Sequence, residues 1–388
     1  MEKIFAILGM LLFVGVAYLF SSEKRKVNWK SVGLAFVGQI ALAFILIKTP
    51  AWKAVEWLSN GFSWLILQSS EGINFVFDGL SDNYVFFINS LLPIVFISAL
   101  MGLLFHFNIL QKFISYVGKF VAKFLKVDTL VAVNGIANMF MGQSDSLFVT
   151  KSYLPSAKDS VIFATLVGGM TSISVSVVGL YASFGATMEW IIVSMPLTVF
   201  STFVLTQILM PTEYSAEEIK VENDKGVNFI ETMMNYATTG FQSAIGIAVA
   251  LMAFLSLVFL INNLIGLFVP GATLQSILGI FFSPLAILMG VPMNEVGIVS
   301  EILATKLVTN EAVAFALPQF GMLSANAKAM VTVALCGFTG FGSIGILIGG
   351  YSAVAPNKVG VVAKLGMKAL MTATIVNLLT GCVVGLVL

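Results

Sequence analysis

Two short polar insertions interrupt apolar stretches of this chain, and both carry groups that can bind a polar ligand. One is Gly142–Ser146, with the sequence Gly-Gln-Ser-Asp-Ser, and the other is Thr309–Glu311, with the sequence Thr-Asn-Glu. Each insertion sets a carboxylate, a carboxamide and a hydroxyl side by side, so each can donate and accept hydrogen bonds. A carboxylate near the bilayer centre costs about 2.5–3.5 kcal/mol on insertion scales, so the pair predicts a binding site.

The elements that must position these groups are membrane-spanning helices. Hydrophobic residues make up 58% of the chain, charged residues 10%, and the mean hydropathy is +0.99, whereas soluble domains carry about 25% charged residues. Apolar runs approach or exceed the roughly 20 residues that span the hydrocarbon. They are Ile4–Phe20, Val32–Ile47, Val85–Phe105, Val161–Phe184, Trp190–Leu209, Ala244–Phe268 and Leu370–Leu388. We expect an all-α polytopic membrane protein with about eight transmembrane helices.

The distribution of lysine and arginine predicts the orientation of the chain. Lys24, Arg25, Lys26 and Lys30 follow the first run, whereas the loops Gly185–Glu189 and Val269–Gln275 carry almost no positive charge. Positively charged loops remain in the cytoplasm. We therefore expect a multi-pass protein of the bacterial inner (cytoplasmic) membrane with both termini outside. The net charge of +1 points to no partner, and no nucleic-acid signature is present.

The order of segments predicts an inverted repeat with two re-entrant hairpins. In one half an amphipathic helix, Ile109–Lys126, precedes a hairpin with its tip at Gly142–Ser146 and a glycine-interrupted run, Gly168–Tyr181. Asp128 or Thr129 is the expected N-cap of that hairpin. Paired glycine-interrupted segments in corresponding halves are typical of transporters built from inverted repeats, and such breaks persist in a membrane only where they are buried or line a wet cavity.

The other half repeats this order. An interfacial helix, Leu274–Met289, precedes a hairpin with its tip at Thr309–Glu311, and the interrupted run Ala329–Tyr351 follows. A Leu-Gln pair marks the start of each unit, at Leu110-Gln111 and Leu274-Gln275. We therefore divide the chain into N-terminal spans with an interfacial helix on the scaffold side (1–105), a first repeat half (106–210), and a sixth span with the second repeat half (211–388).

Three motifs resemble those of the concentrative nucleoside transporter family, of the bacterial nucleoside permease type. Gly142–Phe148 resembles the hairpin tip Gly-Gln-Ser/Thr-Glu-x-Phe, Thr309–Phe315 resembles Asn-Glu-Phe-Val-Ala, and Gly337–Ile346 is similar to Gly-Phe-Ala-Asn-x-Ser-Ser-Ile-x-Ile. The resemblance covers essentially the whole chain and includes the run Pro93–Leu100. It implies a homotrimer with a scaffold and a mobile transport domain, in which cation-driven nucleoside uptake follows an elevator-type alternating-access movement.

The resemblance also implies a set of site residues. Gln143 and Ser144 would hydrogen-bond the nucleobase, Val177 and Phe338 would pack against it, and Glu311 and Ser343 would hold the ribose hydroxyls. A coupling Na⁺ ion would be bound by Asn138, Met141, Ser172 and Ile173, through two side chains and two carbonyls. Two positions depart from the family pattern: Asp145 stands where glutamate is usual, and Gly340 stands where asparagine is usual. Together these departures would remove polar reach and open volume near the sugar, and they predict an altered base or sugar preference.

Several alternatives remain open at this stage. H⁺ could replace Na⁺ as the coupling ion, because Asp145 and Glu311 can titrate in a low-dielectric site. The solute could be a modified nucleoside, a nucleobase or another small polar molecule, or the protein could be a passive channel. An intramembrane enzyme is disfavoured, because neither a His-Glu-x-x-His nor a Gly-x-Ser-x-Gly motif occurs. We expect no catalytic residues and no cofactor beyond the coupling ion.

Overall fold

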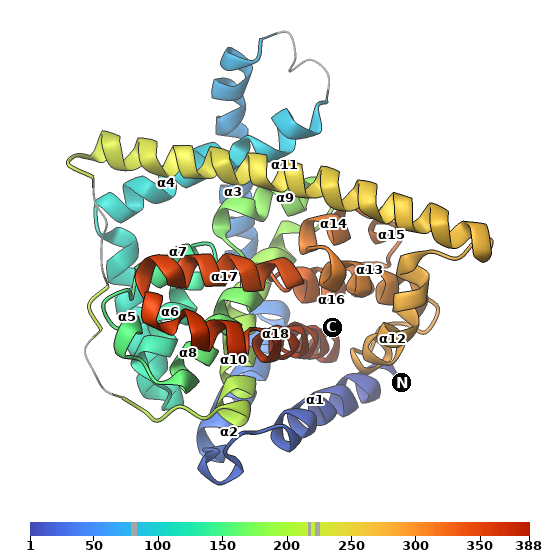
Figure 1. Ribbon diagram of the computed structural model, residues 1–388, viewed down its shortest axis with the longest axis horizontal. Coiled ribbons are helices and arrows are strands. Elements are labelled where there is room, and N and C mark those ends of the chain that lie inside the picture. Colours follow the sequence, from blue (N-terminus) through green and yellow to red (C-terminus); the bar gives the residue numbers. More distant parts are fainter. Residues whose placement is uncertain (79–83, 216–218, 222–225) are drawn as a thin grey trace.

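The computed structural model describes residues 1–78, 84–215, 219–221 and 226–388, and helices dominate these parts of the chain (Figure 1). The helices are α1 (Glu2–Leu19), α2 (Trp29–Lys48), α3 (Trp52–Val76), α4 (Pro93–His106), α5 (Ile109–Leu125), α6 (Thr129–Asn138), α7 (Asp145–Phe148), α8 (Asp159–Thr171), α9 (Val178–Ser183), α10 (Met188–Leu209), α11 (Phe229–Phe268), α12 (Leu274–Leu288), α13 (Val296–Val308), α14 (Glu311–Ala316), α15 (Pro318–Gly321), α16 (Ala325–Leu335), α17 (Phe341–Val354) and α18 (Val359–Val387). The all-α prediction is confirmed.

Seven helical segments in the described residues are long and apolar enough to cross a membrane. They are Glu2–Leu19, Trp29–Lys48, Phe87–His106, Asp159–Ser183, Met188–Leu209, Phe229–Phe268 and Pro356–Val387. Each of them overlaps one of the seven apolar runs named from the sequence. The eighth expected crossing corresponds to α16 and α17, which have 11 and 14 residues and are separated by a break.

The burial of these helices separates an inner from an outer layer. In the most apolar windows, 89% of the α8–α9 segment and 83% of α10 are buried, against 28% of α1 and of α2 and 17% of α11. The helix α11 is 40 residues long and runs across one side of the molecule (Figure 1). The helices α8, α9, α10 and α18 therefore form the core, while α1, α2 and α11 turn apolar surface outward.

Two interrupted helices cross in this core, and each satisfies backbone groups that the other has freed. Between α8 and α9 the chain is extended at Ser172, and between α16 and α17 it is extended at Gly340. The Phe338 amide donates to the Ser172 carbonyl at 3.3 Å, and the Thr339 hydroxyl donates to the Met170 carbonyl at 2.8 Å. Asn377 of α18 donates to Thr339 Oγ1 at 2.6 Å. The two breaks therefore form one hydrogen-bonded unit.

Several local signals in the sequence agree with the structure. Asp128 caps α6 and accepts from the Leu130 amide at 2.8 Å, which is how a helix N-terminus satisfies its free amides. The amphipathic helix α5 buries Leu110, Ile114 and Ala122 along one face, and Lys112 and Lys123 are exposed. The expected interfacial helix near Leu274–Met289 is α12.

The element order of the two halves is the same. The segments α5 to α10 and α12 to α18 each run from an amphipathic or interfacial helix through a short-helix segment and a broken helix to a long helix. The glutamines of the two Leu-Gln pairs also tie the first helix of each half to the preceding one. Gln111 Nε2 donates to the Phe105 carbonyl at 2.7 Å, and Gln275 Oε1 accepts from Asn262 at 3.0 Å. These parallels support the predicted repeat, whose inverted symmetry stays a prediction.

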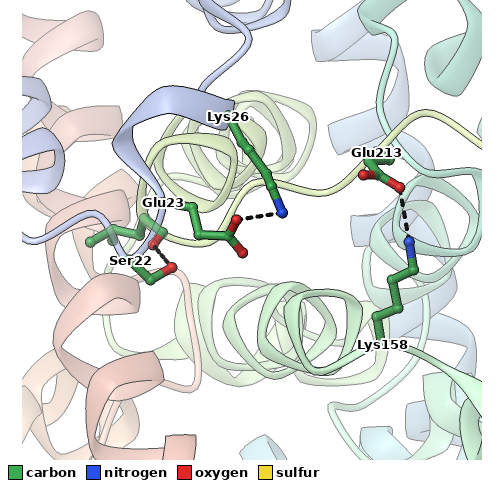
Figure 2. A network of polar contacts seen from close by, with 6 residues as sticks. Ser22, Glu23, Lys26, Lys158 and Glu213 are labelled. Atoms are coloured by element: carbon green, nitrogen blue, oxygen red, sulfur yellow. Dashed lines mark hydrogen bonds and ion pairs between the residues drawn. The ribbon is translucent and has the colours of Figure 1, made fainter.

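Charged side chains from the loops after α1, before α8 and after α10 form two ion pairs (Figure 2). Ser22 donates to the Leu209 carbonyl at 3.0 Å, and Lys158 Nζ lies 2.9 Å from Glu213 Oε2. The hydrogen bond from Lys158 lowers the pKa of Glu213, and the hydrogen bond to Glu23 raises the pKa of Lys26. The side chains of Lys158 and Glu213 are 72% and 74% exposed, so this pair contributes little stability.

The crossing of the two breaks predicts that Gly337 tolerates no side chain. A Cβ atom at Gly337 would lie 2.6 Å from the Thr171 carbonyl oxygen and 2.7 Å from Asn377 Nδ2. Overpacking of this kind costs about 1–3 kcal/mol, so Gly337→Ala should lower the free energy of unfolding in detergent by that amount. The control is Gly342→Ala, because a Cβ at Gly342 meets no atom within 4 Å. Equal stability of the two variants would contradict the close crossing.

Candidate functional site

The first polar insertion runs from the turn after α6 into the first two residues of α7. Gln143 is buried, while Ser144 and Asp145 are half-buried. The Ser144 hydroxyl donates to Asp145 Oδ1 at 3.3 Å, and Asn134 of α6 donates to the Ser146 carbonyl at 3.2 Å. The Asn134 bond ties the far side of the turn back to α6. The sequence Gly-Gln-Ser-Asp-Ser therefore forms an ordered polar tip inside an apolar core.

The second insertion lies between α13 and α14. The Asn310 side chain caps α14 by accepting from the Val313 amide at 2.9 Å, and Glu311 is the first residue of that helix. Glu311 is 8% exposed, and its Oε1 accepts from the Tyr181 hydroxyl of α9 at 3.0 Å. The Tyr181 ring also stacks on Phe315, with 4.8 Å between the ring centroids. A buried carboxylate is thereby joined to the first broken helix.

The structure brings together residues that are far apart in the sequence. Gln143 Nε2 lies 3.5 Å from Ser343 Oγ, across 200 residues of chain, and α17 packs against α7. Ser343 in turn donates to the Phe338 carbonyl. Among the residues that the structure describes, the buried Oε1 atom of Gln143 has no hydrogen-bond partner, which is costly unless a ligand supplies a donor. Gln143 and Ser343 therefore lie side by side, and their contact with a ligand stays a prediction.

The two predicted packing residues lie in the two breaks. Val177 is buried in the short turn that leads into α9, and Phe338 is half-buried in the second break. Phe338 is anchored by its amide to Ser172, as described above. Because the two breaks cross, both side chains belong to the same part of the core.

The space beside Gly340 differs from the sequence-based prediction, which was an open volume near the sugar. A Cβ atom at Gly340 would lie 3.1 Å from the Thr309 carbonyl oxygen and 3.6 Å from that of Lys306. The backbone at the end of α13 and at Thr309 therefore fills the space beside Gly340. The absence of a side chain permits this close approach of the Thr309–Glu311 tip.

Asp145 faces a cavity on the other side of the tip. This cavity has a volume of about 350 Å³ and lies between Gly142 and Asp145 on one wall and Asn235, Tyr236 and Thr239 of α11 on the other. Its remaining lining includes Ser174 and Ser176 from the first break. The carboxylate of Asp145 thus lies where the tip borders the outer helices α4 and α11, whereas Glu311 is enclosed.

The four predicted cation ligands come from the end of α6, the adjoining tip and the first break. Asn138 donates to Asn134 Oδ1 at 3.0 Å, but its own Oδ1 is buried without a partner. The Ser172 hydroxyl donates to the Gly168 carbonyl at 2.7 Å, which leaves its lone pairs free to accept. A Cβ at Gly168 would lie 3.4 Å from Asn138 Nδ2. Met141 is half-buried and Ile173 is buried, and oxygen donors of this kind suit a hard monovalent cation.

Four residues of this region were not identified as site residues from the sequence. They are Tyr181, Lys306, Thr339 and Asn377. Tyr181 donates to Glu311, Lys306 donates to the Ala334 carbonyl, and Thr339 and Asn377 form hydrogen bonds at the crossing of the breaks. Each of them is a polar side chain within an otherwise apolar stretch, and that was the available signal. Their partners lie 28 to 169 residues away, so the sequence alone could not reveal the contacts.

Comparison with protein families gives one consistent result. A model described as "Na+ dependent nucleoside transporter C-terminus" matches residues 190–385, and its N-terminal counterpart matches residues 8–80. A third model, "Nucleoside recognition", matches residues 87–188. Together these matches cover most of the chain and include both polar insertions.

Comparisons with whole proteins and with solved structures point to the same family. The "Nucleoside permease NupC" of Helicobacter pylori is 32% identical, with 99% of this chain and 98% of that protein covered. The "Purine nucleoside transport protein NupG" of Bacillus subtilis is 27% identical, with 98% of each covered. Among solved structures, CNTnw in an inward-facing substrate-bound state is similar with a TM-score of 0.94 at 32% identity, covering 100% of this chain and 98% of that one. An outward-facing CNTnw variant gives 0.93 at 31%, covering 100% and 99%.

The unpartnered Asn138 Oδ1 predicts a sodium-specific stabilisation of the folded protein. A bound ion at a hundred times its Kd stabilises by about 2.7 kcal/mol, so NaCl should raise the Tm in detergent relative to equal concentrations of KCl or choline chloride. Asn138→Leu should abolish this difference.

Gln39→Leu is the matched control, because Gln39 of α2 also has a buried, unpartnered Oε1 but lies away from both tips. It should keep the sodium-specific shift in Tm. If Asn138→Leu kept the full sodium-specific shift in Tm, this result would contradict the role of Asn138 as a ligand of the cation.

Proposed function

Because this chain belongs to the Na⁺-dependent nucleoside transporter family, we propose that it imports nucleosides by cation-coupled secondary active transport. Membership of this family makes the chain a multi-pass membrane transporter and excludes the intramembrane enzyme considered above. The nucleoside itself, the coupling ion and the movement that carries them are our proposal.

The observation that carries the proposal is that each polar tip contacts the broken helix of the other half. Gln143 reaches Ser343 there while keeping an unpaired Oε1, and a carboxamide can meet both the donor and the acceptor edge of a nucleobase. Glu311 is buried next to the first break through its bond to Tyr181, and an ionised carboxylate is a strong acceptor for ribose hydroxyls. Ser144, Val177 and Phe338 complete the proposed site around the base.

We propose Na⁺ as the coupling ion. The support is the family description and the buried, unpartnered Oδ1 of Asn138 next to Ser172 and Gly168. A cation bound there would hold α6 against the C-terminal end of α8, where free carbonyls already favour positive charge. Proton coupling through Asp145 or Glu311 is the second candidate, since both carboxylates lie in the core region.

We propose that transport follows an elevator-type movement in a homotrimer. The similarity to CNTnw structures described as inward-facing, intermediate and outward-facing supports this, with TM-scores from 0.91 to 0.94. The cavity between Asp145 and α11 lies along the boundary at which one part would slide past the other. The exposed apolar surface of α11 is the surface that we assign to lipid and to neighbouring subunits. We also propose that both termini lie outside, because the positively charged loops should face the cytoplasm.

Removal of the Glu311 charge should abolish uptake. In proteoliposomes with an imposed sodium gradient, Glu311→Gln should lower the initial rate of labelled nucleoside uptake about tenfold or more, because hydrogen bonds to charged acceptors contribute about 1.5–3 kcal/mol. Glu301→Gln is the control, since Glu301 lies in the preceding helix α13 and is not placed in the site. Accumulation of nucleoside under a proton gradient alone would support the transport function but contradict Na⁺ as the coupling ion. Wild-type uptake rates in Glu311→Gln would contradict the assignment of the site.

The two departures from the family pattern should set substrate preference. Restoring Gly340→Asn together with Asp145→Glu should change the ratio of purine to pyrimidine nucleoside uptake by about tenfold, the scale expected when polar contacts to a substrate are gained or lost. The close Thr309 carbonyl must shift to admit the new side chain.

The control for this pair is Gly349→Asn, because a Cβ at Gly349 meets open space. It should keep the original ratio. An unchanged substrate profile in the double variant would show that neither residue governs the preference.

A further inference from the structure

One lysine is enclosed in the core without an ion-pair partner among the described residues. Lys306, in the last turn of α13, is 5% exposed. Its ammonium donates to the Ala334 carbonyl at 2.8 Å, and the carboxylate that acts on it electrostatically is that of Glu311. A buried, singly charged group without a contact ion pair is costly, so its retention requires a physical reason.

The surroundings of the Lys306 ammonium are those of a cation site. Ala334 is the penultimate residue of α16, where helical carbonyls lack intrahelical partners and the helix dipole favours positive charge. A small cavity of about 10 Å³ adjoins Lys306, Ala334, Thr339 and Asn377. Asn377 Oδ1, which borders it, is buried without a hydrogen-bond partner. One carbonyl oxygen therefore binds the Lys306 ammonium, and Asn377 offers a second acceptor at the border of a cavity that is otherwise lined mainly by apolar side chains.

This place corresponds to the proposed sodium site of the first half. Asn138 is the last residue of α6, and Lys306 lies two residues before the end of α13, so both are in the last turn before a polar tip. Asn138 lies beside Gly168 near the C-terminal end of α8, and Lys306 contacts Ala334 near the C-terminal end of α16. In each half, a side chain at the end of the first short helix meets the carbonyl end of a broken helix.

We propose that the Lys306 ammonium is a built-in cation that occupies, in the second half, the place that a sodium ion takes in the first. It links α13 to the C-terminal end of α16 and keeps the Thr309–Glu311 tip in position beside Gly340. The second half therefore needs no exchangeable ion. The comparison with sodium rests on the proposed function, but the cation site at Lys306 does not.

The test uses three single variants of the full-length protein in detergent and in proteoliposomes. Lys306→Met removes the charge and keeps the length of the side chain. Lys306→Ala leaves space for three methylene groups and an ammonium, so the probe is n-propylammonium, with n-propanol as its neutral analogue. Lys328→Met is the control, because Lys328 of α16 undergoes the same chemical change in a half-buried position over the Phe320 ring.

The expected result is a specific rescue by charge. Lys306→Met should lower sodium-driven uptake about tenfold, the effect of leaving a buried acceptor without its charged donor, while Lys328→Met stays within about twofold. In Lys306→Ala, n-propylammonium should restore uptake and raise the Tm, and n-propanol should do neither. If Lys306→Ala does not fold, n-propylammonium present during extraction should recover monodisperse protein.

Three results would overturn the proposal. They are wild-type uptake in Lys306→Met, equal rescue by n-propanol and n-propylammonium, and absence of any rescue of Lys306→Ala in either uptake or Tm. The Tm measurement needs no substrate and no gradient. A wild-type protein that accumulates no nucleoside would therefore reject the proposed function and leave the test of Lys306 intact.

Discussion

The site depends on the mutual satisfaction of two interrupted helices. A break in a membrane helix frees amide and carbonyl groups that lipid cannot satisfy. Here the Phe338 amide donates to Ser172 and the Thr339 hydroxyl donates to Met170, so each break supplies partners for the other. Asn377 of α18 braces the same point. This arrangement lets extended backbone exist at the centre of the core, which brings the two polar tips to one place.

The two halves place their charges differently around this crossing. The first tip carries Asp145 on the border with α11 and leaves Asn138 Oδ1 without a partner. The second tip encloses Glu311 beside Tyr181 and has Lys306 behind it. An exchangeable cation in one half and a covalently bound one in the other would explain how similar element orders serve different roles. The first half would then be the one that senses the ion gradient.

The sequence predicted the elements of the fold better than their contacts. The seven apolar runs, the Asp128 cap and the positions of both breaks follow from composition and local chemistry, which are encoded within a few residues. Family motifs then placed Gln143 and Ser343 at a common site. The bond from Tyr181 to Glu311, the crossing of the breaks and the bond from Lys306 to Ala334 join different elements, and their partners lie 28 to 169 residues apart. The expectation of an open volume at Gly340 was wrong for the same reason, because the carbonyl that fills this space comes from another element.

The most direct test is a structure of the protein in lipid nanodiscs with a nucleoside and Na⁺, determined by electron cryo-microscopy. The account predicts nucleoside density in contact with Gln143, Glu311 and Ser343, with a cation against Asn138 and Ser172. Nucleoside density confined to the cavity between Asp145 and α11, without contact to Glu311 or Ser343, would contradict the assignment of the site to the crossed breaks.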